Sequence, residues 1–256
     1  MKLTNDFIIV IPVWNAEHFI IDALLSVFHQ DYTNLGVIIR DDMSTDNTPQ
    51  IIERVLGIDG KKNTHTKHKG KDVIYVQNDK KLYGGGNTFE SVRSYVENPE
   101  AIIGVVDGDD RLLTQDAVSR VKKHYDEMDI WMLWTQHKST SGRDGKSCPI
   151  PENYLDLNRE YWSVDHFRTS KAWLFNKINR YDMIFPLTNE YYPVCGDAAF
   201  LFPTIEMVGI ERSYFLDEEL YLYRDNITTN DMYVDLLGSR KYAKFIRHNG
   251  TRYYKL

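Results

Sequence analysis

The stretch Ala101-Ile102-Ile103-Gly104-Val105-Val106-Asp107-Gly108-Asp109-Asp110 sets a short apolar run directly before three carboxylates. A run of this length, rich in β-branched residues, predicts a strand buried on both faces, here over residues 101–106. Ligands of open α/β sheets bind outside the carboxyl ends of the strands. This stretch therefore predicts an α/β fold with a polar site where the strand ends.

Further buried strands are expected on either side of this stretch, separated by helices. Ile20, Leu24, Val27 and Phe28 follow the spacing of one helix face, and Thr48-Pro49 is a typical helix start. Strands alternating with helices predict a mostly parallel, Rossmann-like sheet flanked by helices. The other predicted strands are residues 7–13, 37–40, 73–76 and 130–135, and the other predicted helices are residues 87–96 and 118–125.

The second half is less regular, and we divide a single predicted domain, 1–256, into residues 1–136 and 137–256. Residues 57–72 and 138–158 are polar, without period, and are expected to be exposed loops. Helices are predicted near residues 170–179, 197–207 and 232–247.

Composition limits the classes of function. The net charge of −6 argues against a nucleic-acid partner, although residues 238–256 carry six Lys or Arg and no acid. Two cysteines, Cys148 and Cys195, suit a reducing compartment. With no leader-like segment and no run long enough to cross a bilayer, a soluble cytoplasmic protein is expected. The basic C-terminus suggests a peripheral membrane contact.

The chemistry of the acidic stretch favours a metal site. Three crowded carboxylates repel one another unless a cation or hydrogen bonds compensate. Oxygen ligands suit Mg²⁺ or Mn²⁺, which bridges protein carboxylates and substrate phosphates. The alternative is an acidic turn, since Asp-Gly is common turn chemistry. A second cluster, Asp41-Asp42-Met43-Ser44-Thr45-Asp46, follows another predicted strand and either binds a ligand or caps the next helix.

The ordered set of motifs resembles glycosyltransferase family 2. It comprises Pro12-Val13-Trp14-Asn15 after the first strand, the Asp41 cluster after the second, and Asp107-Gly108-Asp109-Asp110 after the fourth. Later, Cys195-Gly196-Asp197-Ala198 resembles the same stretch of the family's spore-coat polysaccharide enzymes. The resemblance implies a GT-A fold with an acceptor-side C-terminal half. It also implies sugar transfer with inversion from a nucleotide-diphosphate donor, of the UDP type, to a hydroxyl on a glycan, lipid-linked or protein acceptor.

Residue roles are carried over by the same resemblance. Asp197 is implied as the catalytic base and Asp42 as a contact of the nucleotide base, while Asp109 and Asp110 are implied as ligands of Mn²⁺ or Mg²⁺. The glycine-rich turn before Asn87 is a further phosphate candidate, because backbone amides at helix starts cradle phosphate. The full predicted nucleotide-binding set is Pro12, Val13, Asn15, Asp42, Gly86, Asp107, Gly108 and Asp109.

The chain departs from the family in one respect, because Tyr83-Gly84-Gly85-Gly86-Asn87 lacks the arginine that often follows the third strand. His166, Arg168 and Trp162 are candidates for binding the acceptor or the diphosphate. Arg212 and Arg224 are further candidates for the diphosphate. His248 is not expected to complete a metal shell. Two alternative functions are a sugar-1-phosphate nucleotidyltransferase, which usually has a basic glycine-rich loop after its first strand, and an inactive nucleotide-sugar-binding module.

Overall fold

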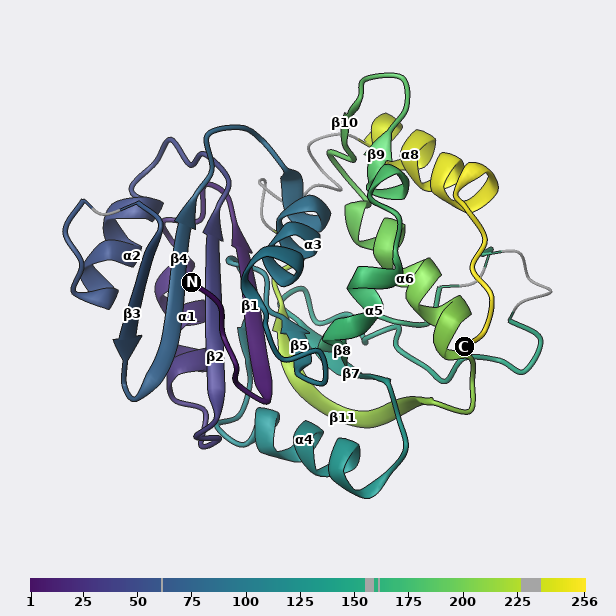
Figure 1. The fold of residues 1–256 in the computed structure, drawn as a ribbon, viewed down its shortest axis with the longest axis horizontal. Coiled ribbons are helices and arrows are strands. Elements are labelled where there is room, and N and C mark those ends of the chain that lie inside the picture. Colours follow the sequence, from purple (N-terminus) through teal and green to yellow (C-terminus); the bar gives the residue numbers. More distant parts are fainter. Residues whose placement is uncertain (61, 155–158, 161, 227–235) are drawn as a thin grey trace.

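The structure, a computed structural model, describes residues 1–60, 62–154, 159–160, 162–226 and 236–256. Its frame is a nine-stranded sheet in the order β3-β4-β2-β1-β5-β8-β7-β11-β6 (Figure 1). Strands β4, β2, β1 and β5 run parallel, as do β7 and β11. The strands are β1 (Phe7–Val13), β2 (Leu35–Asp41), β3 (Thr64–His68), β4 (Lys71–Gln77), β5 (Ile102–Val105), β6 (Arg111–Leu112), β7 (Met132–Ser139), β8 (Arg168–Lys171) and β11 (Ser213–Tyr223).

Strand β1 lies at the centre of the parallel part because both of its faces are apolar. All seven residues are buried, and successive side chains point to opposite faces of the sheet. Phe7, Ile9 and Ile11 join one hydrophobic core, whereas Ile8 and Val10 join the other. The continuous apolar run that predicted the strand thus fills two cores at once.

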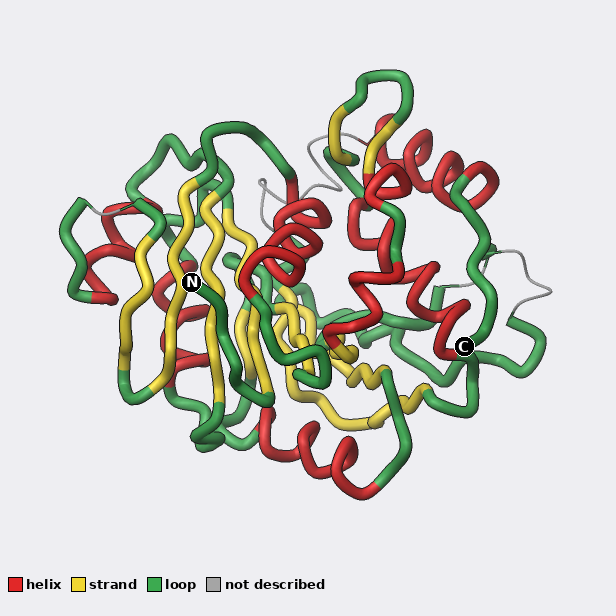
Figure 2. The backbone as a smooth tube through the Cα atoms, viewed as in Figure 1, coloured by secondary structure: helices red, strands yellow, loops and turns green. Residues whose placement is uncertain are grey.

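Helices cover both faces of the sheet, as expected (Figure 2). Helices α1 (Ile20–Phe28), α2 (Thr48–Leu56) and α4 (Ala117–Glu127) pack on one face. Helices α3 (Tyr83–Tyr95), α5 (Ala172–Lys177) and α6 (Gly196–Val208) pack on the other. Ile20, Leu24, Val27 and Phe28 are the predicted inner face of α1, and all four are buried.

Two sequence predictions were wrong at the antiparallel strands. Residues 57–72 are not one loop, because Thr64–His68 pairs antiparallel with β4 as the edge strand β3. The helix expected from residue 170 starts two residues later, because Arg168–Lys171 is strand β8, inserted antiparallel between β5 and β7. Both strands are polar, so their backbone pairing leaves no apolar alternation in the sequence.

The remainder of the second half stands on the α3 face. It contains the 3-10 helix η1 (Arg180–Met183), the two-stranded hairpin β9 (Ile184–Phe185) and β10 (Glu190–Tyr191), and helix α8 (Leu236–Asn249). The helix expected over residues 232–247 is α8, although residues 232–235 lie outside the described part. Of the helices described, none is both long and apolar enough to cross a membrane.

Candidate active site at the carboxyl ends of the strands

The acidic turn after β5 is pressed against the end of β1. The amide of Gly108 donates a hydrogen bond to the carbonyl of Pro12 over 3.0 Å. A Cβ at Gly108 would lie 2.6 Å from the Cβ of Val13, so a larger residue would push the two strand ends apart. Pro12, Val13 and Gly108 therefore form the floor that sets the position of the carboxylates.

Asp110 is the most deeply buried of these carboxylates, with 1% of its surface exposed. It accepts hydrogen bonds from the Tyr221 hydroxyl at 2.9 Å and from the Arg224 amide at 2.7 Å. Burial, together with the charges of Asp109 and Asp107, raises the pKa of the Asp110 carboxyl well above its usual value. An excess of negative charge is thus held in place at this point, and a cation would relieve it.

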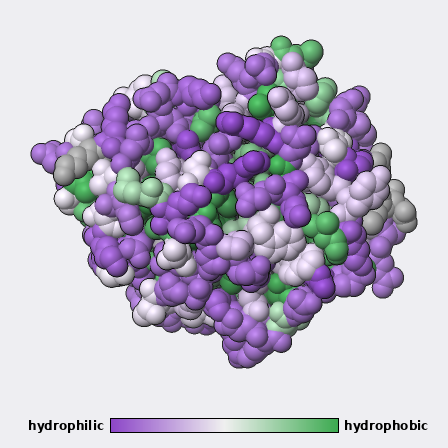
Figure 3. Space-filling model, in the orientation of Figure 1, coloured by the Kyte–Doolittle hydropathy of each residue, from purple (hydrophilic) through white to green (hydrophobic). Residues whose placement is uncertain are grey.

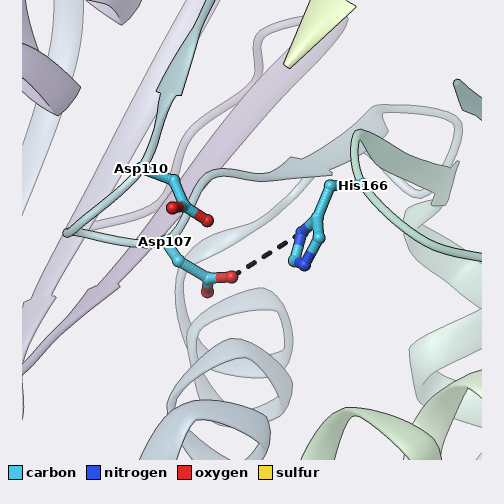
Figure 4. Close-up of side chains that lie close together, drawn as sticks. All are labelled: Asp107, Asp110 and His166. Carbon is cyan, nitrogen blue, oxygen red and sulfur yellow. Dashed lines mark ion pairs between the residues drawn. The ribbon is translucent and has the colours of Figure 1, made fainter. Parts of the chain in front are cut away.

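His166, from the residues just before β8, joins these carboxylates (Figure 4). One ligand atom each of Asp107, Asp110 and His166 lie within 4.8 Å of one another. The His166 ring stacks between Tyr221 and Tyr223, at centroid distances of 4.7 and 5.0 Å. Burial, then the charges of Arg168 and His137, lower its pKa well below the usual value, so the imidazole is neutral.

This donor set fits a divalent cation. Two carboxylates and a neutral imidazole are ordinary ligands for Mn²⁺, and carboxylates also suit Mg²⁺. Nδ1 of His166 lies 3.8 Å from the nearer oxygen of Asp107, a separation that leaves both atoms to turn toward a shared ion. Asp109 is not in this group of described residues. Its carbonyl accepts a hydrogen bond from the Arg224 guanidinium, and burial raises the pKa of its own carboxyl. Its predicted metal contact stays a prediction.

Arg168 connects the acidic turn with Asp197. Its guanidinium pairs with the Asp197 carboxylate at 2.5 Å and lies 4.0 Å from Asp107. Burial alone would lower the pKa of Arg168, but Asp197, Asp107 and Asp165 together raise it, so the cation is permanent. Asp197 keeps 38% of its side chain exposed and is open to a ligand.

A close helix crossing sets the position of Asp197. A Cβ on Gly85 of α3 would lie 2.2 Å from the carbonyl carbon of Gly196, the first residue of α6. Only glycine at position 85 lets the two backbones approach this closely, and a Cβ on Gly196 would also be tight, 3.2 Å from Gly85. Asp197 follows in the first turn of α6, where the positive end of the helix favours a carboxylate. It is not the N-cap, which is Cys195.

Residues of the second predicted cluster connect neighbouring loops through hydrogen bonds. The buried Asp42 carboxylate accepts hydrogen bonds from the amides of Leu82 and Tyr83 and from the side chain of Asn78. The side chain of Asn15 accepts one from the Thr45 amide at 2.8 Å. Both residues lie after their strands as expected, but neither role toward a nucleotide is tested by these contacts.

Several weaker candidates have structural partners of their own. Gly86 faces the Tyr191 ring, with 2.6 Å between that ring and a Cβ built on the glycine. Trp162 packs edge-on against Phe202 of α6. Arg212 pairs with Asp129, and His248 lies 3.4 Å from Glu160.

Sequence reasoning missed Tyr221, Tyr223 and His137, which surround His166. Tyr221 is fully buried, and the ring of His137 meets that of His166 edge-on at 6.0 Å. Tyr221 and Tyr223 alternate at the end of β11, so they point to one face of the sheet. That alternation was the available signal, and the strand carrying it was not predicted.

Solved structures with this architecture are GT-A glycosyltransferases. TarS of S. aureus, residues 1–349 in complex with UDP, has a TM-score of 0.62 and 19% identity, over 88% of this chain and 60% of that one. Glucosyl-3-phosphoglycerate synthase of Mycobacterium tuberculosis, with Mn²⁺, UDP and glucosyl-3-phosphoglycerate, has a TM-score of 0.59 and 15% identity, over 96% and 81%. A mannosyltransferase of Pyrobaculum calidifontis, with GDP-Man and Mn²⁺, has a TM-score of 0.58 and 14% identity, over 90% and 59%. At such identities the likeness shows the fold alone.

The sequence itself identifies the family. The family described as Glycosyl transferase family 2 matches residues 8–182, more than half of the chain. The chain therefore belongs to glycosyl transferase family 2, and it spans about 60% of the length of the TarS chain that it matches. A curated relative, an uncharacterized glycosyltransferase of Haemophilus influenzae, is 39% identical over 51 residues, which are 20% of this chain and 20% of that protein. The family match includes Asp107, Asp110, His166 and Arg168 but ends before Asp197.

Proposed function

We propose that the chain transfers a sugar, with inversion and with the help of a divalent metal, from a UDP-type nucleotide-sugar to an acceptor hydroxyl. The observation that carries this proposal is the arrangement of three groups side by side. Asp107, Asp110 and His166 form a metal-ligating group, and Arg168 joins it to the half-exposed carboxylate of Asp197. A leaving-group site and a proton acceptor are thus held at a fixed distance from each other.

On the donor side, Asp107, Asp110 and His166 would hold Mn²⁺ or Mg²⁺, with Asp109 as the further ligand expected from the sequence. The ion, when bound, stabilises negative charge that develops on the departing diphosphate. Support comes from the family and from two of the structures above, the synthase and the mannosyltransferase, which contain Mn²⁺ together with UDP or GDP-Man. Pro12, Val13, Asn15, Asp42, Gly86 and Gly108 are proposed to line the nucleotide.

Arg168 takes the place of the arginine that the glycine-rich turn lacks. Its permanent charge lies between the acidic turn and Asp197, within reach of a diphosphate held at the turn. Trp162, the other candidate from the sequence, packs on Phe202 of α6 and is given no role in this proposal.

On the acceptor side, Asp197 removes the proton from the attacking hydroxyl. The Arg168 guanidinium holds its carboxylate at the start of α6, where it can accept a proton from the acceptor. Because Asp197 lies across Arg168 from the metal-ligating group, the acceptor attacks the face of the sugar opposite the leaving diphosphate. Attack on that face would invert the configuration of the anomeric carbon.

The proposal is tested by donor hydrolysis. A panel of UDP- and GDP-sugars is incubated with and without Mn²⁺, and the nucleoside diphosphate released when water replaces the acceptor is measured. Release from a UDP-sugar that requires metal and stops with chelator is expected. Release of pyrophosphate from a sugar-1-phosphate and UTP would instead indicate a nucleotidyltransferase. Calorimetric binding of UDP and Mn²⁺ without any turnover would indicate a binding module.

A further inference from the structure

Two neighbouring segments give the second half a basic, apolar-tipped face that the catalytic machinery does not use. They are the β9–β10 hairpin, residues 184–191, and helix α8, which lie side by side (Figure 1). The contact between them is aromatic, because the Phe185 ring meets those of Tyr242 and Phe245 at centroid distances of 4.9 and 5.2 Å. Lys241 of α8 also lies over the Phe185 ring, 5.1 Å from its centroid. We call these two segments the hairpin–helix face.

The outer side of α8 is a cationic stripe. Arg240, Lys241, Lys244 and His248 are all exposed, and their spacing places them within one arc of the helix. Arg247 lies in the same arc but is partly covered and contacts Glu160. No carboxylate among the described residues pairs with Arg240, Lys241 or Lys244. The opposite side, with Tyr242, Phe245 and Ile246, packs on the hairpin and the core.

Two large hydrophobic side chains are exposed at the hairpin tip and in the helix before it. Leu187 is 77% exposed at the tip, and Tyr181 of η1 is 78% exposed. Figure 3 shows hydrophobic atoms at the edge of the molecule over this hairpin. Glu190 is the one acid in the hairpin, and α8 has none. Exposed apolar side chains rimmed by lysine and arginine are the chemistry that binds an anionic bilayer surface.

We propose that the hairpin–helix face docks on a membrane rich in anionic lipids, and that the acceptor is therefore anchored in that membrane. The second clause rests on the proposed function and on connectivity. Strand β10 ends at Tyr191, and only four residues separate it from Gly196 and Asp197 at the start of α6. The Tyr191 ring also packs on Gly86 of α3, so the docking face and the proposed base belong to one packed unit.

The test is sedimentation with vesicles of phosphatidylcholine, either pure or mixed with phosphatidylglycerol, over a range of salt concentrations. The wild-type chain should sediment with the anionic vesicles at low salt and be released by high salt. Arg240→Glu combined with Lys244→Glu should weaken partitioning at least about 25-fold, since each basic residue contributes about fivefold. Leu187→Asp should weaken it about tenfold, because the apolar tip no longer enters the interface.

Matched controls are Lys123 in α4 and Met128 directly after it, and α4 lies away from the hairpin–helix face in Figure 1. Lys123→Glu and Met128→Asp are exposed changes of the same kinds and should leave vesicle binding unchanged. Failure of the wild-type chain to bind anionic vesicles at low salt would overturn the proposal. So would a result in which the double charge reversal abolishes binding while Leu187→Asp leaves it intact, because the face would then bind by charge alone and its apolar tip would not enter the bilayer.

Donor hydrolysis in lipid-free buffer separates this proposal from the proposed function. The docking variants should retain wild-type, metal-dependent hydrolysis of the donor. Vesicle binding by a chain that hydrolyses no nucleotide-sugar would leave docking in place and refute the proposed chemistry. Normal hydrolysis with no vesicle binding would refute docking and leave the proposed chemistry in place.

Discussion

At the scale of single residues, the site depends on charges that compensate one another. Asp110 is buried beside two further carboxylates, and Arg168 is buried between Asp107 and Asp197. Buried charges are retained only when they are paired or bind a metal. The two clusters therefore have different requirements, since Asp110 has excess negative charge whereas Asp197 already has its cation.

We predict that Asp110→Asn removes metal binding while the chain stays folded. The amide keeps the size of the carboxylate but has no charge to offer a dication. In the wild-type chain, Mn²⁺ at about a hundred times its dissociation constant should stabilise the fold by about 2.7 kcal/mol, which raises Tm by about 5–10 °C. Thermal unfolding with and without Mn²⁺ measures this shift, and Asp129→Asn, at an exposed carboxylate, is the control. An undiminished Mn²⁺ shift in Asp110→Asn would rule out this ligand.

Asp197→Asn should lower kcat about 100- to 10,000-fold, the range that a general base contributes. Binding of UDP with Mn²⁺, measured by calorimetry, should be unchanged, because Asp197 lies on the acceptor side of Arg168. Turnover at the wild-type rate would refute the role of base. Loss of UDP binding would move Asp197 to the donor side.

At the scale of elements, the crossing of α3 and α6 is the tightest packing next to the site. Gly84, Gly85 and Gly86 are consecutive, yet their surroundings differ completely. A Cβ on Gly84 meets nothing within 4 Å, whereas one on Gly85 meets the backbone of Gly196. The glycine run, taken from sequence as a phosphate-binding candidate, has a clear packing role at its second position.

Gly85→Ala should therefore destabilise the fold by about 1–3 kcal/mol and displace Asp197, because overpacking forces the two helices apart. Gly84→Ala is the matched control in the same helix turn and should stabilise by up to about 1 kcal/mol. Denaturant unfolding measures both changes, together with donor hydrolysis. Equal effects of the two substitutions would contradict the close crossing.

The sequence predicted those elements whose burial is apolar. Strand β1 and helix α1 were located almost to the residue, since their apolar residues recur with the period of the element. Strands β3 and β8 were missed because their side chains are polar and show no apolar alternation. Arg168 is buried only because Asp107 and Asp197 surround it, and no local pattern in the sequence reveals such distant partners.

The candidate site was likewise predictable only in part. The positions of Asn15, Asp42 and the acidic turn after their strands followed from the alternation of strands and helices. The grouping of Asp107 and Asp110 with His166 did not, because His166 comes from a later segment and is held by tyrosines of β11. Side-chain direction decides which carboxylates meet, and sequence spacing leaves that direction open.

At the scale of the whole molecule, a buried ion pair ties the C-terminal segment to the core. Arg159 and Glu206 are 2% and 3% exposed and form two parallel hydrogen bonds, at 2.8 and 2.6 Å. Arg159 also donates to the carbonyl of Thr251, and Glu206 accepts from Arg252. Arg159, helix α6 and the last residues of the chain thus share one network.

Glu206→Ala should destabilise the fold by about 3–5 kcal/mol, because it leaves the Arg159 charge buried without its partner. A decrease in Tm of about 10 °C is expected. Glu127→Ala removes an exposed partner of Lys123 and should change stability by less than about 0.5 kcal/mol. Comparable effects of the two substitutions would show that the network contributes nothing beyond a surface pair.

The order of the strands has a consequence for how the chain can be cut. Strand β8 from the second half lies between β5 and β7, and β6 from the first half forms the far edge against β11. The hydroxyl of Tyr221 and the amide of Arg224 hold Asp110 across the same division. Fragments 1–136 and 137–256 divide β7 between them, and each lacks strands that complete the other's sheet, so each should be inactive alone. Donor hydrolysis restored by mixing them would then report reassembly of the site itself.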